Sequence, residues 1–180
     1  MLKRVVLVFV ALIALMQPPV VDAAQKGYPA KVTTLQNHKY VDALISGIKG
    51  AKSEIVGCFF LFKVSGKHGG LPQKIVEELV AAKKRGVDVS IELEQDAGGK
   101  GTVYEQNRLA ARILTDAGVK VRFDAPKTTT HVKAIVIDGR YVYLGSHNLT
   151  QSALKYNNEL SVMIDSKDFA AEVLGYLDSL

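Results

Sequence analysis

The densest cluster of reactive side chains in the chain lies in the sequence His131-Val132-Lys133-Ala134-Ile135-Val136-Ile137-Asp138-Gly139, which continues to Gly145-Ser146-His147-Asn148. Apolar residues on both sides of Asp138-Gly139 predict two strands, and Asp-Gly between two apolar runs is typical of a β-hairpin turn. Side chains alternate along a strand, so His131 and Lys133 are expected on one face.

The register of this hairpin has two alternatives. A turn at Asp138-Gly139 places His131 opposite Ser146, whereas a turn one residue later places His131 opposite Asn148. Either register returns the Gly-Ser-His-Asn end of the hairpin beside its His-Lys end. An imidazole, an ammonium, a hydroxyl and a carboxamide would then converge on one anion-binding patch that contains a potential nucleophile.

The first 23 residues have the layout of a secretory signal peptide. Lys3 and Arg4 precede an apolar run at 5–16, and Val21 and Ala23 occupy the small-residue positions before a cleavage point. We expect cleavage after Ala23 and export to the periplasm or the medium. An uncleaved anchor is the alternative, but the apolar run is shorter than the roughly 20 residues that a spanning helix needs.

Residues 24–180 are long enough for one domain with its own core. Loss of the leader lowers the formal net charge from +5 to +4, and this modest basicity suits an anionic partner. This part of the sequence has no apolar or basic amphipathic element of the kind that binds membranes, so we do not expect stable membrane association. The single cysteine, Cys58, lies in an apolar run and is expected to be buried. One cysteine and four scattered histidines do not have the spacing of a structural zinc site.

Strand and helix patterns alternate along the rest of the chain and predict an α/β fold, a mixed β-sheet flanked by helices. Asn37 is a candidate helix cap. The glycine-containing segment 94–102 does not have P-loop spacing and is expected to be a mobile surface loop near the substrate. The expected strands cover 31–35, 55–62, 87–93, 119–123 and 160–164, and the expected helices cover 41–48, 71–84, 105–117 and 169–180.

The fixed positions of the hairpin form the pattern H-x-K-x4-D-x6-G-S-x-N, which resembles the HKD motif of the phospholipase D superfamily at every fixed position. The single copy, the short chain, the Arg85-Gly86-Val87 turn and Glu159, eleven residues after Asn148, resemble the small bacterial endonuclease branch. The resemblance covers most of 24–180 and implies a phospholipase D-like α/β sandwich.

The resemblance also implies a chemistry: phosphodiester cleavage without a metal or another cofactor. One motif histidine attacks phosphorus and forms a phosphohistidine, and a second protonates the leaving oxygen and then activates water; a histidine pKa near 6.5 suits both tasks. Glu159 is implied to orient a motif histidine, and Asp138, on the turn, to act through fold and orientation. The implied catalytic residues are His131, Lys133, Asp138 and Glu159, and the implied phosphate-binding residues are Lys133, Ser146 and Asn148.

Two histidines are required, but the chain has one motif. Small members of the superfamily solve this by pairing one motif from each subunit of a homodimer, and a two-fold interface lets one sequence supply both halves. The alternative is that His147 acts within the same chain. His38 and His68 are expected to be surface or loop histidines.

The sequence leaves three candidate functions to be tested. The first is an exported nuclease that cleaves DNA or RNA with low sequence specificity, because contacts to phosphates carry little sequence information. The second is a hydrolase of phospholipid or cardiolipin, and the third is a nucleic-acid-binding protein without activity. Basic side chains that could line an approach to the site are Lys63, Lys67, Lys83, Lys84, Arg85 and Lys100.

Overall fold

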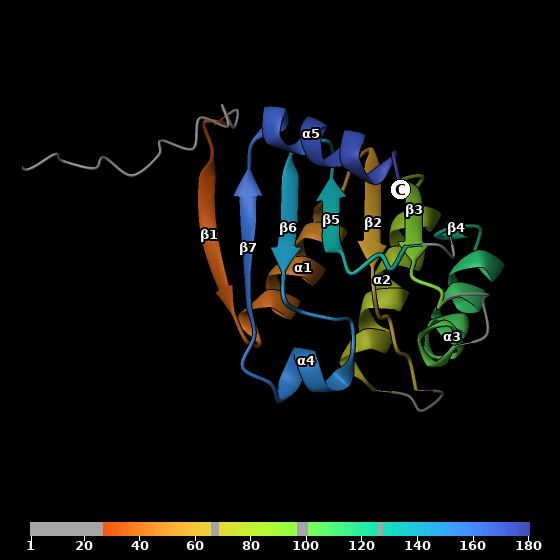
Figure 1. The fold of residues 1–180 in the computed structure, drawn as a ribbon. Helices are drawn as coiled ribbons and strands as arrows, with labels where there is room; N and C mark the ends of the chain where they lie inside the picture. Colours follow the sequence, from red (N-terminus) through yellow and green to blue (C-terminus); the bar gives the residue numbers. More distant parts are fainter. Residues whose placement is uncertain (1–26, 66–68, 97–100, 126–127) are drawn as a thin grey trace, which may run out of the picture.

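The computed structural model describes residues 27–65, 69–96, 101–125 and 128–180, so the predicted signal peptide lies outside the described residues. Seven strands form one mixed sheet in the order β1-β7-β6-β5-β2-β3-β4 (Figure 1). The strands are β1 (Lys31–Gln36), β2 (Glu54–Phe59), β3 (Asp88–Leu93), β4 (Lys120–Phe123), β5 (Lys133–Ile137), β6 (Tyr141–Gly145) and β7 (Leu160–Asp165).

Helices cover both faces of this sheet, as the sequence predicted. Helices α1 (Lys39–Gly50), α2 (Leu71–Lys84) and α3 (Thr102–Asp116) enclose the larger apolar core on one face, and α5 (Lys167–Leu177) covers β5 and β6 on the other. The short helix α4 (Gln151–Lys155), which the sequence did not predict, follows β6 below the sheet in Figure 1. No helix in the described part of the chain is long and apolar enough to cross a membrane.

The strand directions bring chemically important loops to one edge of the sheet. Strands β2, β3 and β4 are parallel, whereas β5 is antiparallel to both β2 and β6, and β7 is antiparallel to β6 and β1. The ends of β1, β2, β3, β4 and β6 therefore lie beside the starts of β5 and β7. We call this end of the strands the site edge; the opposite end of the strands, which carries the β5–β6 turn, is the far edge.

Strand β5 is the middle strand of the sheet and is buried on both faces. Ile135 and Ile137 point into the larger core, and Val136 joins Val142 and Ala170 in the smaller core under α5. This two-sided burial explains the nearly uninterrupted apolar sequence before Asp138. It also fixes the register of the strand firmly, because a shift by one residue would exchange its two faces.

Both predicted registers of the hairpin are wrong by one residue. Ile137 pairs with Tyr141, and Ala134 pairs with Leu144. Asp138 and Gly139 both have positive φ angles, 54° and 55°, and the amide of Arg140 donates to the carbonyl of Ile137 at 3.1 Å. Arg140 is thus an extra residue after the turn, and its ion pair with Asp165 (2.5 Å) holds it on β7.

Candidate active site

The site begins where β5 enters the sheet. Lys133 is the first residue of β5 and is buried, whereas His131, two residues earlier, is exposed at the site edge. The ammonium of Lys133 donates to the main-chain carbonyl of His131 at 2.9 Å and lies 5.0 Å from the centre of the Phe60 ring. The same ring contacts the imidazole of His131 at a centroid distance of 4.5 Å. Phe60 therefore packs against both motif residues.

The surroundings adjust the protonation of the two motif residues. Loss of solvation and the neighbouring Lys133 charge both lower the pKa of His131. Burial lowers the pKa of Lys133, and the Glu159 carboxylate partly opposes this change. A lowered histidine pKa favours the neutral imidazole, whose free nitrogen lone pair is what a nucleophile requires.

Gly145 ends β6 at a point where no larger residue fits. A Cβ atom there would lie 2.4 Å from the Cα of Ser161 and 2.6 Å from the carbonyl oxygen of Leu160. The next residue, Ser146, exchanges hydrogen bonds with Leu160: its amide donates to the Leu160 carbonyl (3.1 Å) and its Oγ accepts from the Leu160 amide (3.0 Å). The glycine thus lets β6 approach β7 and fixes Ser146 at the site edge.

Glu159 lies directly beside Ser146. Its carboxylate accepts hydrogen bonds from the hydroxyl of Ser146 and from Nδ2 of Asn157 (3.0 Å). Among the described residues these are the side chains that hydrogen-bond this carboxylate, and His131 is not one of them. The structure thus brings Glu159 to Ser146 and within electrostatic reach of Lys133, while its action on a histidine stays a prediction.

Asn37 also belongs to this edge, although not as the predicted helix cap. It has a positive φ of 52°, and His38 occupies the cap position of α1 without a side-chain hydrogen bond. The Asn37 side chain instead accepts from the amide of Glu159 at 2.9 Å, and its own amide donates to the Glu159 carbonyl at 3.0 Å. Asn37 therefore ties the end of β1 to the residue that precedes β7.

Asn148 lies half-buried in the loop after β6. The following residue, Leu149, holds this loop against the segment after β2 through its amide, which donates to Leu61 (2.9 Å), and its carbonyl, which accepts from Lys63 (3.0 Å). The Oδ1 atom of Asn148 is buried and makes no hydrogen bond to the described residues. Its carboxamide is therefore not fully used by the fold, as expected for a group that meets a ligand.

His147 is a structural residue in this fold. It is fully buried, its ring stacks on Tyr40 at 4.3 Å, Nε2 lies 3.0 Å from the Asn37 carbonyl, and Nδ1 lies 2.7 Å from Oγ of Ser161. A carbonyl can only accept, so Nε2 donates and Nδ1 accepts from the serine. Burial lowers the pKa of His147. Both ring nitrogens are occupied, which argues against proton transfer to a substrate by this histidine.

Asp138 lies at the far edge, at the opposite end of β5 from His131. Its carboxylate accepts from the amides of Lys52, Ser53 and Glu54 at 2.8–3.2 Å and from the Ser53 hydroxyl at 3.0 Å. These bonds fix the turn before β2 against the hairpin. The structure therefore does not bring Asp138 together with the reactive groups, and its role is to support the fold.

The predicted basic approach is also divided between the two edges. Lys83 forms an ion pair with Asp88 (3.5 Å) at the start of β3, and Arg85 donates to the Ile48 carbonyl (2.8 Å), so the end of α2 lies at the far edge. Lys63, bonded to Leu149, lies near the site. Lys67, His68 and Lys100 lie outside the described residues.

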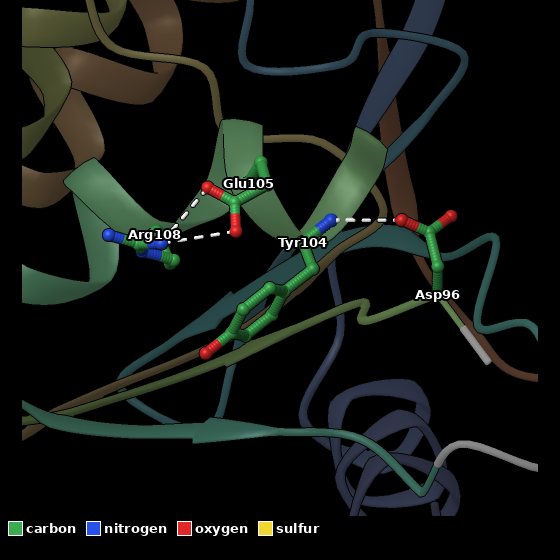
Figure 2. A network of polar contacts seen from close by, with 4 residues as sticks. All are labelled: Asp96, Tyr104, Glu105 and Arg108. Carbon is green, nitrogen blue, oxygen red and sulfur yellow. Dashed lines mark hydrogen bonds and ion pairs between the residues drawn. The ribbon is translucent and has the colours of Figure 1, made fainter. Parts of the chain in front are cut away.

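The segment after β3 is well anchored where the structure describes it. Asp96 accepts from the amide of Val103 at 2.7 Å and from the amide of Tyr104 at 3.1 Å, both at the start of α3; Figure 2 shows the bond to Tyr104. Gly101 precedes the helix, and a Cβ atom there would lie 2.0 Å from the Asp96 carboxylate. Asp96 thus supplies the helix cap, and residues 97–100 of the predicted mobile loop lie outside the described residues.

Cys58 and metal ligation complete the inventory of reactive groups. Cys58 is buried as expected, and burial, reinforced by the Glu92 charge, raises its thiol pKa to about 12, so it stays protonated. No three His, Cys, Asp or Glu side chains gather into a possible metal site within the described ranges.

A phospholipase D fold with a histidine–lysine pair at its site edge defines the class: a phospholipase D-superfamily phosphodiesterase domain. Residues 44–180 match the family described as cardiolipin synthase, PLD-like domain, and the chain belongs to this family. Cardiolipin synthase A of Proteus mirabilis is 30% identical over 131 residues, which are 73% of this chain and 25% of the relative. The chain thus spans about a quarter of the length of this curated relative.

Solved structures extend the comparison. The phospholipase D family member Nuc from Salmonella typhimurium superposes with a TM-score of 0.69 at 27% identity, and the match covers 84% of this chain and 93% of Nuc. NucT from Helicobacter pylori gives a TM-score of 0.66 at 18% identity, with coverage of 84% and 95%, and supports the fold. The predicted superfamily and fold are confirmed.

Proposed function

We propose that this domain hydrolyses the phosphodiester backbone of nucleic acids, DNA or RNA, with low sequence specificity and without a metal. The observation that carries the proposal is the exposed His131 at the wall of an open groove of about 300 Å³. Hydroxyl-bearing side chains share its other walls with Ala125 and Leu180: Thr128, Thr129, Thr130, Tyr176 and Ser179. Such a groove suits a hydrated sugar–phosphate chain better than the acyl chains of a lipid.

In the proposed first step a ring nitrogen of His131 attacks phosphorus, and a nitrogen–phosphorus bond forms as the bond to the leaving oxygen breaks. A second imidazole gives its proton to that oxygen. In the second step the same imidazole takes a proton from water, the water oxygen bonds to phosphorus, and His131 is released. Lys133 supplies a fixed positive charge for the phosphoryl oxygens, and Asn148 and Ser146 supply hydrogen bonds.

We propose that the second imidazole is His131 of a second copy of the chain in a two-fold homodimer. His147 is engaged by Ser161 and Asn37. His38 follows β1, which lies three strands from β5, a separation of roughly 14 Å at about 4.8 Å per strand. Neither residue is placed to share one phosphate with His131, whereas a symmetric partner would supply an identical, exposed imidazole.

The comparisons favour a second candidate substrate, a phospholipid diester, because the matched family and the curated relatives are cardiolipin synthases. The structural similarity to Nuc and NucT favours nucleic acid instead. The hydroxyl groups in the walls of the groove also favour nucleic acid over lipid. We also propose that the domain acts after export, in the periplasm or outside the cell, as the leader sequence predicts.

The test uses residues 24–180 with plasmid DNA, single-stranded RNA and cardiolipin vesicles, each with excess EDTA. We expect EDTA-resistant nucleic-acid cleavage that His131→Ala abolishes. His38→Ala, an exposed histidine at the start of α1, is the matched control and should cleave normally. Cleavage that EDTA stops would contradict the metal-free mechanism, lipid turnover alone would favour the second candidate, and binding without turnover of any substrate would indicate an inactive binding protein.

A further inference from the structure

Two buried carboxyl groups lie at the site edge outside the motif. Glu94 follows β3 and Asp124 follows β4, and they are 3% and 4% exposed. The Glu94 carboxylate accepts a hydrogen bond from the amide of Thr130, the residue immediately before His131. Asp124 accepts from the amide of Gln95 at 2.9 Å. The pair therefore connects the ends of β3 and β4 to the main chain of the nucleophile.

Asn107 on α3 fixes the same region from the helical side. It is fully buried, and its Oδ1 accepts from the amide of Phe62 at 2.7 Å. Its Nδ2 donates to the carbonyls of Phe60 (3.0 Å) and Glu94 (2.9 Å). Asp96 anchors the start of this helix through the amides of Val103 and Tyr104, and Figure 2 shows the bond to Tyr104. One side chain thus locks the ends of β2 and β3 together.

The result is a main chain held at three consecutive residues around the nucleophile. The Thr130 amide donates to Glu94, the His131 carbonyl accepts from Lys133 (2.9 Å), and the Val132 carbonyl accepts from the Phe60 amide (2.8 Å). The Phe60 ring then contacts the imidazole itself. In the first of these contacts the acceptor is the Glu94 carboxylate, which lies outside the motif.

A buried acid pair is an expensive way to stabilise a fold, because charged groups lose hydration and an apolar pair of similar volume is often at least as stable. Burial and a hydrogen bond with Asp124 raise the pKa of Glu94 to about 7, and the Asp124 and Asp96 charges act in the same direction. A raised pKa lets the Glu94 carboxyl keep a proton near neutral pH while its other oxygen accepts from the Thr130 amide.

We propose that Glu94 is a positioning residue for His131, and that Asn107 holds the main chain of Glu94 in place. The inference rests on the proposed attack by His131 on a phosphodiester, but it does not depend on whether the natural substrate is nucleic acid or lipid. Glu94 does not touch the substrate. It fixes the direction from which the imidazole meets phosphorus, and displacements of about 1 Å can slow a reaction by about 100-fold.

The test compares Glu94→Gln, Glu94→Leu and Glu92→Gln. Glutamine keeps an oxygen for the Thr130 amide and an NH2 for Asp124, whereas leucine keeps similar bulk but no acceptor. Glu92 is the matched control: it is a buried carboxyl of β3, bonded to Arg122 at 2.7 Å and not to residues 130–132. The substrate is bis(p-nitrophenyl) phosphate, a diester with neither a base nor an acyl chain.

We expect Glu94→Leu to lower kcat by about 10-fold to 100-fold with KM changed by less than about 2-fold, and Glu94→Gln to retain at least about a third of kcat. The 1H–13C NMR signal of the His131 ring, assigned with His131→Ala, should shift or split in Glu94→Leu and stay in place in Glu92→Gln. Unchanged kcat and an unchanged His131 signal in folded Glu94→Leu would overturn the inference. So would an equal loss of kcat in Glu92→Gln.

Failure of the proposed function gives a different pattern. Wild-type protein that hydrolyses the model diester but not DNA or RNA would remove the nuclease proposal and leave this inference in force if Glu94→Leu is slow. If the wild type hydrolyses no diester, the NMR signal decides the positioning role by itself. A His131 signal that is the same in the wild type and in Glu94→Leu would then refute it.

Discussion

Lys133 donates a hydrogen bond from Nζ to the main-chain carbonyl of His131, two residues earlier, at 2.9 Å. The ammonium therefore stays beside the imidazole before any substrate arrives. The neighbouring Lys133 charge lowers the pKa of His131, and in the proposed mechanism the same charge stabilises the phosphoryl oxygens.

Substitution of Lys133 should separate these effects. We expect Lys133→Met to lower kcat on a phosphodiester by about 100-fold to 1,000-fold, the usual cost of losing one such donor. The pKa of His131 should rise, because a neighbouring positive charge is removed. Steady-state kinetics and an NMR titration of the His131 ring measure the two results. A normal kcat in Lys133→Met would show that the charge is not used on the phosphoryl group.

His147 should matter for stability and not for turnover. His147→Leu removes both hydrogen bonds; it leaves the Ser161 hydroxyl without a partner and the Asn37 carbonyl with the Tyr40 amide alone, so we expect the free energy of unfolding to fall by about 2–4 kcal/mol. Urea unfolding measures this change. The kcat per folded molecule should stay within about 2-fold of wild type. Selective loss of kcat in a folded His147→Leu protein would instead support the intrachain alternative.

Asp138→Ala should also be a stability variant. Burial disfavours the ionised carboxyl, but the hydrogen bonds from the turn before β2 outweigh it and lower the pKa of Asp138. A lowered carboxyl pKa stabilises the fold above the unfolded-state pKa near 3.9, and this contribution is lost as the pH falls through the folded-state value. The gap in unfolding free energy between wild type and Asp138→Ala should therefore be widest near pH 7 and shrink toward pH 3.

The dimer proposal predicts how activity responds to mixing. If each site takes one His131 from each subunit, wild type mixed with His131→Ala should lose activity as the square of the wild-type fraction. An equal mixture, after subunit exchange, should keep about a quarter of the activity. Mixing with His38→Ala controls for dilution, and native mass spectrometry of the mixture verifies that heterodimers form. A linear decrease would show that each chain carries a complete site.

Glu94 should impose a pH dependence on folding. Its pKa of about 7 lies above the unfolded value, so the folded state retains a proton that the unfolded chain has lost. This contribution is complete below the unfolded pKa near 4.3 and is lost as the pH rises toward and through 7. Glu94→Gln should remove part of the decline in unfolding free energy between pH 5 and pH 8. Parallel curves for the two proteins over this range would contradict the assignment.

Local sequence pattern was enough to predict most of the fold and part of the site. The apolar alternation around Asp138-Gly139 predicted β5 and β6, and His131 with Lys133 stand at one end of β5. The register could not be predicted, because Arg140 is accommodated by a partner on β7, 25 residues later. The structural role of His147 could not be predicted either, because its partners Ser161 and Asn37 lie 14 and 110 residues away in the sequence.

The residues that support His131 could not be predicted from sequence pattern. Phe60 is one aromatic in an apolar run, and nothing local shows that its amide bonds Val132. Glu94 and Thr130 are 36 residues apart, and Asn107 lies on a helix whose pattern indicates only an amphipathic face. Buried polar residues at the ends of strands are the signal that would have found Glu94 and Asp124. Their partners still require the folded chain.

The central position of β5 has a consequence for how the protein loses activity on heating. A strand flanked by three neighbours on each side exchanges its amide protons only when the whole sheet opens. His131 lies two residues before this strand, and the main chain around it is bonded to Phe60 after β2 and to Glu94 after β3, so fraying of β1 alone leaves these bonds in place. Heating should then leave His131 in working order until the domain unfolds cooperatively, and inactivation and melting should occur together.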